Sequence, residues 1–266
     1  MYFIVTVQAP DAMDMAAGAF VIDFRYSLLK VNIWNIIELW KGSMQQNAKG
    51  GYSMERRAIK VNAPMNKKLS MKVIPGHFAT SSSHVNQYLD LTGMKTRQSD
   101  AAEAARVMAR QYVNSTIVDT VVCLEGCQVI GAFLAQELSA VGIMSMNMHQ
   151  TIYIIAPEFN SNGQMIFREN NLPAVYSKHI LLLAGSATTG DTLKKSIDCI
   201  QYYGGMVEGI SAIFSAVDKV DGITVHSIFK AKDVPDYMSY DIGECPMCEA
   251  KQRLEAIVNG NGYIKL

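Results

Sequence analysis

Residues 179–193, which read HILLLAGSATTGDTL, indicate the fold. The run at 179–183 is apolar enough for a strand that is buried on both faces of a sheet. Small and hydroxylated residues follow at 184–190 and predict a loop, and a helical pattern begins at Asp191. A buried strand that leads directly into a helix is typical of α/β domains with a parallel sheet.

Strand and helix patterns alternate along the chain on both sides of this segment. We expect further strands over residues 116–124, 150–156, 206–217 and 223–229, and helices over residues 100–112, 130–138 and 191–203. The first of these helices begins with a capping-box pattern, Asp100-Ala-Ala-Glu103, and Gly204-Gly205 ends the last. The sequence therefore predicts an α/β fold with a mainly parallel central sheet and helices on both faces.

The composition excludes several classes of protein. The 266 residues include 24 Lys and Arg against 24 Asp and Glu, so we expect neither a nucleic acid nor a membrane as partner. Hydrophobic residues make up 49% of the chain and charged residues 18%, which supports a real core and excludes disorder. The odd count of 5 Cys fits reduced thiols, so we expect a cytoplasmic protein.

Residues 1–53 differ from the rest, and two explanations stay open. Both Trp residues lie in the apolar stretch 31–40, which has helix-like spacing, and a polar, Gly-rich segment follows at 41–53. One explanation is an ordinary N-terminal helix and linker. The other is a translated leader with the natural start at Met54, because Lys49-Gly50-Gly51 can be encoded by a purine run that resembles a ribosome-binding site. Under both explanations one domain occupies residues 54–266.

The loop at 184–190 has the features of a phosphate site. Free backbone N–H groups and the helix dipole at the start of the following helix favour an anion, and Gly190 lets a ligand approach the backbone closely. An ordinary strand-to-helix turn would show the same pattern, so that alternative stays open. The candidate phosphate-binding residues are Ser186, Ala187, Thr188, Thr189, Gly190 and Thr192.

The run from Thr188 to Leu193 (TTGDTL) resembles the ribosyl-phosphate signature of type I phosphoribosyltransferases. Three more segments resemble the orotate phosphoribosyltransferases of that family: residues 76–90, 121–138 and the Cys-Pro-x-Cys tail at 244–266. The resemblance covers residues 70–266. The family's two acidic residues, which hold the ribose 2′- and 3′-hydroxyls, are replaced here by Ala184 and Gly185.

The resemblance implies roles for residues in these segments. A small N-terminal hood over about residues 70–95 would contact the base. The candidates for this contact are Phe78, Ser81, Ser82 and Tyr88, and the candidates for the pyrophosphate loop are Glu125, Gly126 and Cys127. The resemblance also implies a homodimer, a phosphorylated ligand such as phosphoribosyl pyrophosphate (PRPP) or a nucleotide, and Mg²⁺ if the protein is catalytic.

Two departures from the family pattern weaken the case for catalysis. The stretch at 157–175, where the family has a flexible loop with a Lys, contains Arg168 as its single cation. The loss of one electrostatic contact of this kind typically raises a barrier by about 2.7–4 kcal/mol. The two missing acids add a further deficit. We therefore expect either an orotate phosphoribosyltransferase-like enzyme of pyrimidine nucleotide metabolism with an impaired active site, or a catalytically silent nucleotide-binding regulatory protein. The catalytic residues stay unassigned.

Cys245-Pro-Met-Cys248 has the spacing of half a zinc site. A structural zinc needs four ligands, and a second pair could come from a partner chain. Reduced thiols near a turn are the favoured interpretation, so we expect no metal site, and a reversible disulfide is a third alternative. His77 and His84 bracket residues 78–83, where they could line a ligand pocket or lie in a surface loop.

Overall fold

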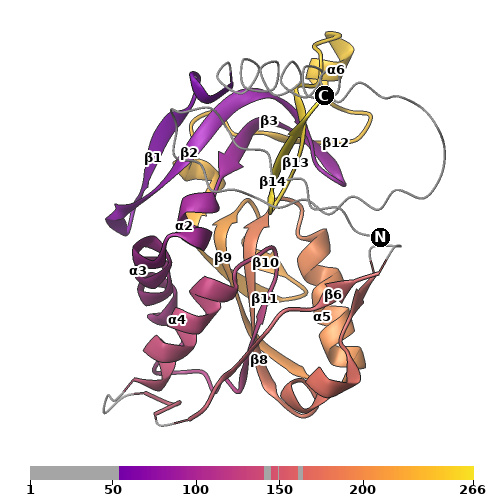
Figure 1. The fold of residues 1–266 in the computed structure, drawn as a ribbon. Coiled ribbons are helices and arrows are strands. Elements are labelled where there is room, and N and C mark those ends of the chain that lie inside the picture. Colours follow the sequence, from indigo (N-terminus) through magenta and orange to yellow (C-terminus); the bar gives the residue numbers. More distant parts are fainter. Residues whose placement is uncertain (1–53, 141–144, 149, 161–163) are drawn as a thin grey trace, which may run out of the picture. The chain divides into compact units, whose positions relative to one another are not determined.

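The computed structural model describes residues 54–266, apart from residues 141–144, 149 and 161–163. The two alternatives for residues 1–53 therefore lie outside the described residues. The described chain forms a central sheet with helices and a second sheet, the hood (Figure 1). None of its described helices has the length and apolar character needed to cross a membrane.

The central sheet is mainly parallel, as the sequence predicts. Its strand order is β10-β11-β9-β8-β4-β5, and only the β10–β11 pair is antiparallel among these neighbours. The strands are β4 (Thr120–Cys123), β5 (Tyr153–Ile155), β8 (His179–Ala187), β9 (Met206–Ser215), β10 (Lys219–Val220) and β11 (Ile223–Lys230).

Helices cover both faces of the central sheet, which confirms the predicted α/β fold. Helices α3 (Gln98–Ala109) and α4 (Gln128–Ser139) cover one face, and α5 (Asp191–Tyr202) covers the other (Figure 1). Along β8, Leu181 packs in the cluster beneath α3 and α4, whereas Leu182 packs in the cluster beneath α5. This alternation follows from the two-residue period of a strand, and it explains why β8 is apolar on both faces.

The hood is larger than residues 70–95, and it draws on both ends of the described chain. Its strands are β1 (Ile59–Ala63), β2 (Asn66–Ala79), β3 (Ser83–Asp90), β12 (Ser239–Asp241), β13 (Ala256–Asn259) and β14 (Gly262–Lys265). They follow the order β12-β3-β2-β13-β14, with β1 paired to β2. The C-terminal segment thus completes a sheet that the N-terminal segment begins.

Short elements connect these parts. They are α2 (Thr92–Thr96), β6 (Glu158–Phe159), β7 (Met165–Ile166), the 3-10 turns η1 (Glu169–Ala174) and η2 (Ala231–Asp233), and α6 (Pro246–Glu249).

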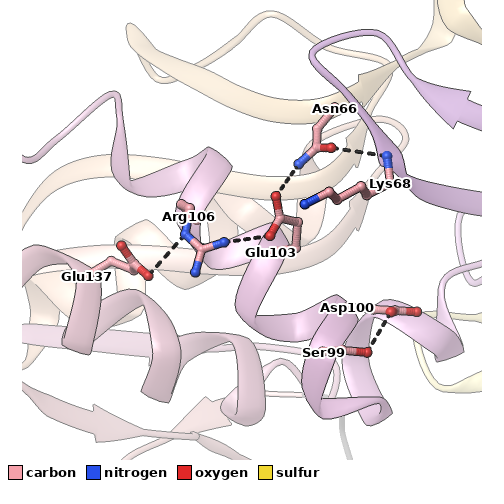
Figure 2. A network of polar contacts seen from close by, with 7 residues as sticks. All are labelled: Asn66, Lys68, Ser99, Asp100, Glu103, Arg106 and Glu137. Atoms are coloured by element: carbon pink, nitrogen blue, oxygen red, sulfur yellow. Dashed lines mark hydrogen bonds and ion pairs between the residues drawn. The ribbon is translucent and has the colours of Figure 1, made fainter.

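The predicted capping box at the start of α3 is wrong, because the helix begins before Asp100 and Glu103 has other partners. Figure 2 shows the Glu103 carboxylate between Asn66, whose Nδ2 donates to it at 2.6 Å, and Arg106, whose guanidinium donates at 2.6 Å. Arg106 also forms an ion pair with Glu137 of α4 at 3.5 Å. Glu103 therefore links α3 to the hood instead of closing its own helix, and its partner Arg106 links α3 to α4.

The predicted strand at 179–183 is too short. Strand β8 continues through Ala187 because Ala184, Ser186 and Ala187 pair in parallel register with β9. Only three residues, 188–190, remain between β8 and α5. Ala184 and Gly185 therefore lie inside the sheet.

The Tyr112 hydroxyl fixes the segment after α3 to the central sheet. It donates to the Ile210 carbonyl at 2.8 Å and accepts from the Ser211 hydroxyl at 3.1 Å, all in buried surroundings. We expect Tyr112→Phe to lower the free energy of unfolding by about 1–2 kcal/mol, because buried polar groups lose their partner. Tyr202, which is 84% exposed, supplies the control: Tyr202→Phe should leave urea unfolding unchanged. Equal effects of the two substitutions would contradict this role.

Candidate functional site

A crevice is expected where β4 and β8 lie side by side. The chain leaves β4 into α4 on one face of the sheet, and it leaves β8 into α5 on the opposite face. Ligands of parallel α/β sheets bind at such a point, beyond the carboxyl ends of the strands, because the diverging connections leave it open. Glu125 follows β4. Ser186 and Ala187 end β8, and residues 188–192 lead from it into the first turn of α5.

The loop between β8 and α5 presents backbone donors. Gly190 is the N-cap of α5 with φ +88°, a conformation that L side chains rarely adopt. Within the described chain, the amides of Thr188, Thr192 and Leu193 donate no hydrogen bond to another residue. Free N–H groups at a helix start attract an anion, and the helix dipole adds to that attraction.

This loop lines a cavity of about 90 Å³ that the hood also lines. Opposite it lie the turn at residues 80–82 and the tip of the β13–β14 hairpin at residues 258–260. The predicted phosphate-binding residues Ser186, Ala187, Thr188, Thr189, Gly190 and Thr192 all line the cavity. So do Ser81, Ser82 and Glu125, which the resemblance places at the site.

A second cavity adjoins the first and shares several of its walls, among them Ser186 and Thr188. Its further lining is mostly apolar and includes Tyr88, Phe214 and Tyr237. Tyr237 forms a side-chain hydrogen bond with Thr188, and burial raises the pKa of its hydroxyl. The two cavities together make a cleft with hydroxyls and amides at one end and aromatic rings at the other.

Glu125 reaches from the end of β4 to β8. It adopts a left-handed conformation, with φ +52°, and its Oε2 accepts the Ser186 N–H at 2.9 Å. A Cβ atom at Gly185 would lie 2.7 Å from that same oxygen. The Glu125 carboxylate therefore fills the space that a side chain at position 185 would need. Burial raises the pKa of Glu125, while the Ser186 amide and Lys95 act in the opposite direction.

Lys95 holds three parts of the site together. Its side chain is buried, and its ammonium donates to the Glu125 carbonyl at 3.1 Å and to the Gly260 carbonyl. The Lys95 ammonium thus connects helix α2 to the turn after β4 and to the β13–β14 hairpin. Its charge also favours an anion nearby, since Lys95 lines the second cavity.

Some predicted site residues lie away from both cavities. Phe78 is fully buried in the hood core, and Cys127 is fully buried with its pKa raised to about 12, so neither side chain is free to touch a ligand. Arg168 is exposed and donates to Glu158 at 2.6 Å. Ala184 and Gly185 are buried within β8, and the exposed Gly126 has φ +76°.

Sequence reasoning missed several residues that line the cleft. Thr80, Tyr237 and Asn259 lie in or beside segments that are distant in the sequence from the loop at 188–190. The Asn-Gly-Asn-Gly run at 259–262 is a hairpin signal, and it could have predicted β13 and β14. His77 and His84, which the sequence left as either pocket or surface residues, lie beside Cys245 and Cys248, with one ligand atom of each residue within 4.8 Å of the others.

No protein-family model matches the sequence, and no curated protein matches it. Among solved structures, orotate phosphoribosyltransferase from Aeropyrum pernix matches with 19% identity and TM-score 0.43, over 60% of this chain and 88% of that one. The Mycobacterium tuberculosis H37Rv orotate enzyme matches with 16% identity and TM-score 0.42, over 61% and 91%. Adenine phosphoribosyltransferase from Thermoanaerobacter pseudethanolicus matches with 12% identity and TM-score 0.41, over 67% and 98%.

The contact between Glu125 and Gly185 predicts the result of introducing an acid into β8. We expect Gly185→Asp alone to lower the free energy of unfolding by about 1–3 kcal/mol, because the new side chain overlaps the Glu125 carboxylate. The double variant Gly185→Asp with Glu125→Gly should regain part of that loss, which a double-mutant cycle in urea measures. Additive effects of the two substitutions would contradict the shared space.

Proposed function

We propose that this protein binds a phosphorylated ribose compound, either PRPP or a nucleoside monophosphate, in the cleft between β8 and the hood. The observation that carries the proposal is the loop at 188–190, whose unpartnered amides and helix start open on a cleft with an aromatic far end. A phosphate monoester matches the donors, and a base matches the rings. The resemblance of TTGDTL to the ribosyl-phosphate signature supports the same assignment.

The phosphate end suits a monoester at the tip of a ligand. Thr188, Thr189 and Thr192 add hydroxyl donors to the backbone amides. Asp191 stands in the first turn of α5, where its exposed carboxylate favours the helix but opposes additional negative charge. We therefore place a single phosphate group here.

The other end of the cleft suits a flat ring. Tyr88 and Tyr237 contribute aromatic surface, and Gln87 lines the same cavity. In the described structure the Oε1 atom of Gln87 is buried without a hydrogen-bond partner, while its Nε2 donates to the Pro235 carbonyl. A buried acceptor of this kind is normally satisfied, so an N–H group of a base is a chemically suitable partner. A pyrimidine with an imide N–H fits this description.

Of the two candidate functions, we favour a protein that binds the phosphorylated ligand but does not transfer phosphoribose efficiently. The stretch 157–175 has Arg168 as its single cation, and that guanidinium is paired with Glu158. The Glu125 carboxylate lines the same cavity as the loop at 188–190, and a negative charge there would oppose a departing pyrophosphate instead of stabilising it. A regulatory protein that senses a nucleotide needs the cleft but not that charge.

Glu125 also favours a second candidate, which is transfer of phosphoribose to orotate or another base in the cytoplasm by a homodimer. A carboxylate beside position 185 can accept hydrogen bonds from ribose hydroxyls in place of the missing acids. Mg²⁺ commonly binds through one carboxylate and the phosphates of a substrate, and Glu125 fits that donor set. When bound, the ion would neutralise charge on the pyrophosphate, while Glu125 orients the ribose.

Isothermal titration tests the binding site. We expect ribose 5-phosphate, uridine monophosphate and PRPP to release or absorb heat, and uridine to bind at least about tenfold more weakly, because it lacks the charged group. Thr192→Val should weaken uridine monophosphate binding about tenfold by removing one hydroxyl contact. Thr224→Val, on an exposed strand position, is the matched control. Absence of heat for every phosphorylated compound at millimolar concentration would reject the site.

Pyrophosphate release distinguishes the two candidate functions. With PRPP, Mg²⁺ and a panel of bases that includes orotate, we expect turnover well below the usual enzyme range of about 1–10³ per second. The physical reason is the shortage of free cations over residues 157–175. A rate within the usual range with any base would remove the regulatory interpretation and establish transfer.

A further inference from the structure

Four side chains that no part of the proposed function uses converge in the hood, near the end of β2 and the start of β3. His77 lies on β2 and His84 on the antiparallel strand β3, while Cys245 and Cys248 flank and lie in α6. One ligand atom from each residue lies within 4.8 Å of all the others. Residues 168 positions apart in the sequence thus bring two imidazoles and two thiols to one point.

The distances within this cluster match a tetrahedral metal site. His77 Nε2 lies 3.2 Å from His84 Nδ1 and 3.5 Å from the Cys245 sulfur. The Cys248 sulfur lies 3.6 Å from His77 Nε2 and 3.3 Å from His84 Nδ1. With Zn–N near 2.0–2.1 Å and Zn–S near 2.3 Å, the edges of a tetrahedron are roughly 3.3–3.8 Å long. The side chains already hold nearly that spacing.

Neighbouring groups orient the first of these ligands. His77 is fully buried, and its Nδ1 donates to the Gln252 carbonyl at 2.9 Å, which leaves Nε2 as the free acceptor toward the cluster. A histidine that binds a metal usually donates its other ring N–H to a carbonyl or carboxylate in this way. The contact fixes both the tautomer and the angle of the ring.

The backbone around the cysteines also has the form of a ligand turn. The amides of Cys248 and Glu249 both donate to the Cys245 carbonyl, at 3.0 and 3.2 Å. This turn brings the two sulfurs to the same side, where the imidazoles meet them. Two residues between the cysteines is a common ligand spacing in structural zinc sites.

We propose that His77, His84, Cys245 and Cys248 bind one zinc ion in a closed structural site. Two thiolates and two imidazoles in tetrahedral order are the donor set of zinc rather than of Mg²⁺ or Ca²⁺, which prefer oxygen. All four positions are filled by protein side chains, so the ion has no place for a substrate or water. The site joins the hairpin of β2 and β3 to the segment that carries β13 and β14.

Metal analysis of the full-length chain, purified without chelator or histidine tag, tests this site. We expect about one zinc per chain in the wild type and less than about one fifth of that in Cys248→Ser, because three ligands hold zinc poorly. Cys248 is exposed, so its replacement disturbs little packing. Cys199→Ser is the matched control, since Cys199 lies outside the cluster, and it should retain zinc.

Cobalt substitution of the wild-type chain keeps the test independent of whether variants fold. Co²⁺ added to the metal-free protein should produce the visible absorption of a tetrahedral site with thiolate ligands, and zinc should displace it. The melting temperature should fall when a chelator removes the metal and recover when zinc returns. Failure of the wild type to bind either metal, a Cys245–Cys248 disulfide in its place, or full zinc content in Cys248→Ser would each overturn the proposal.

Discussion

The site depends on one constraint of chain topology, which is that neighbouring parallel strands β4 and β8 send their helices to opposite faces of the sheet. Helix α4 packs in one hydrophobic cluster and α5 in the other. The two connections must therefore separate at the carboxyl edge of the sheet, and the space between them cannot be closed by either helix. The loop at 188–190 and Glu125 lie beside that opening, and residues 80–82 and 258–260 of the hood line the same cavity.

A second constraint is that the Glu125 side chain packs directly against the backbone at Gly185 and Gly260. Glu125 takes the left-handed conformation that a glycine would adopt more easily, and Cβ atoms at Gly185 and Gly260 would both overlap its side chain. These two glycines and Glu125 are thus mutually dependent, and a change at one position has to be matched at another. The Glu125 carboxylate thus reaches the backbone of β8 at Ser186 from the end of β4.

The sequence predicted the parts of the fold that depend on local pattern. The apolar runs predicted β8, β9 and β11, and the 3.6-residue period predicted α4 and α5, with their ends correct to within a few residues. The start of α3 was missed because Glu103 bonds to Asn66 and Arg106, and tertiary partners outweigh a local capping signal. A loop between β8 and α5 was predicted because its residues are contiguous in the sequence, whereas the aromatic end of the cleft gathers residues from three distant segments.

The cluster of His77, His84, Cys245 and Cys248 shows why a sequence motif does not predict a site that is formed by residues far apart in the chain. Neither His77 nor His84 carries a motif, and they lie near Cys245 because β12 pairs with β3 on one side of the cysteines and β13 pairs with β2 on the other. Glu255, which follows the cysteines, donates its amide to the His77 carbonyl at 2.9 Å, and the hairpin tip beyond it lines the phosphate cavity. A metal at the cluster would therefore fix the position of one wall of the cleft without touching the ligand. The Lys95 contacts to Gly260 and Glu125 hold the opposite end of that wall, so the hairpin is secured at both of its ends.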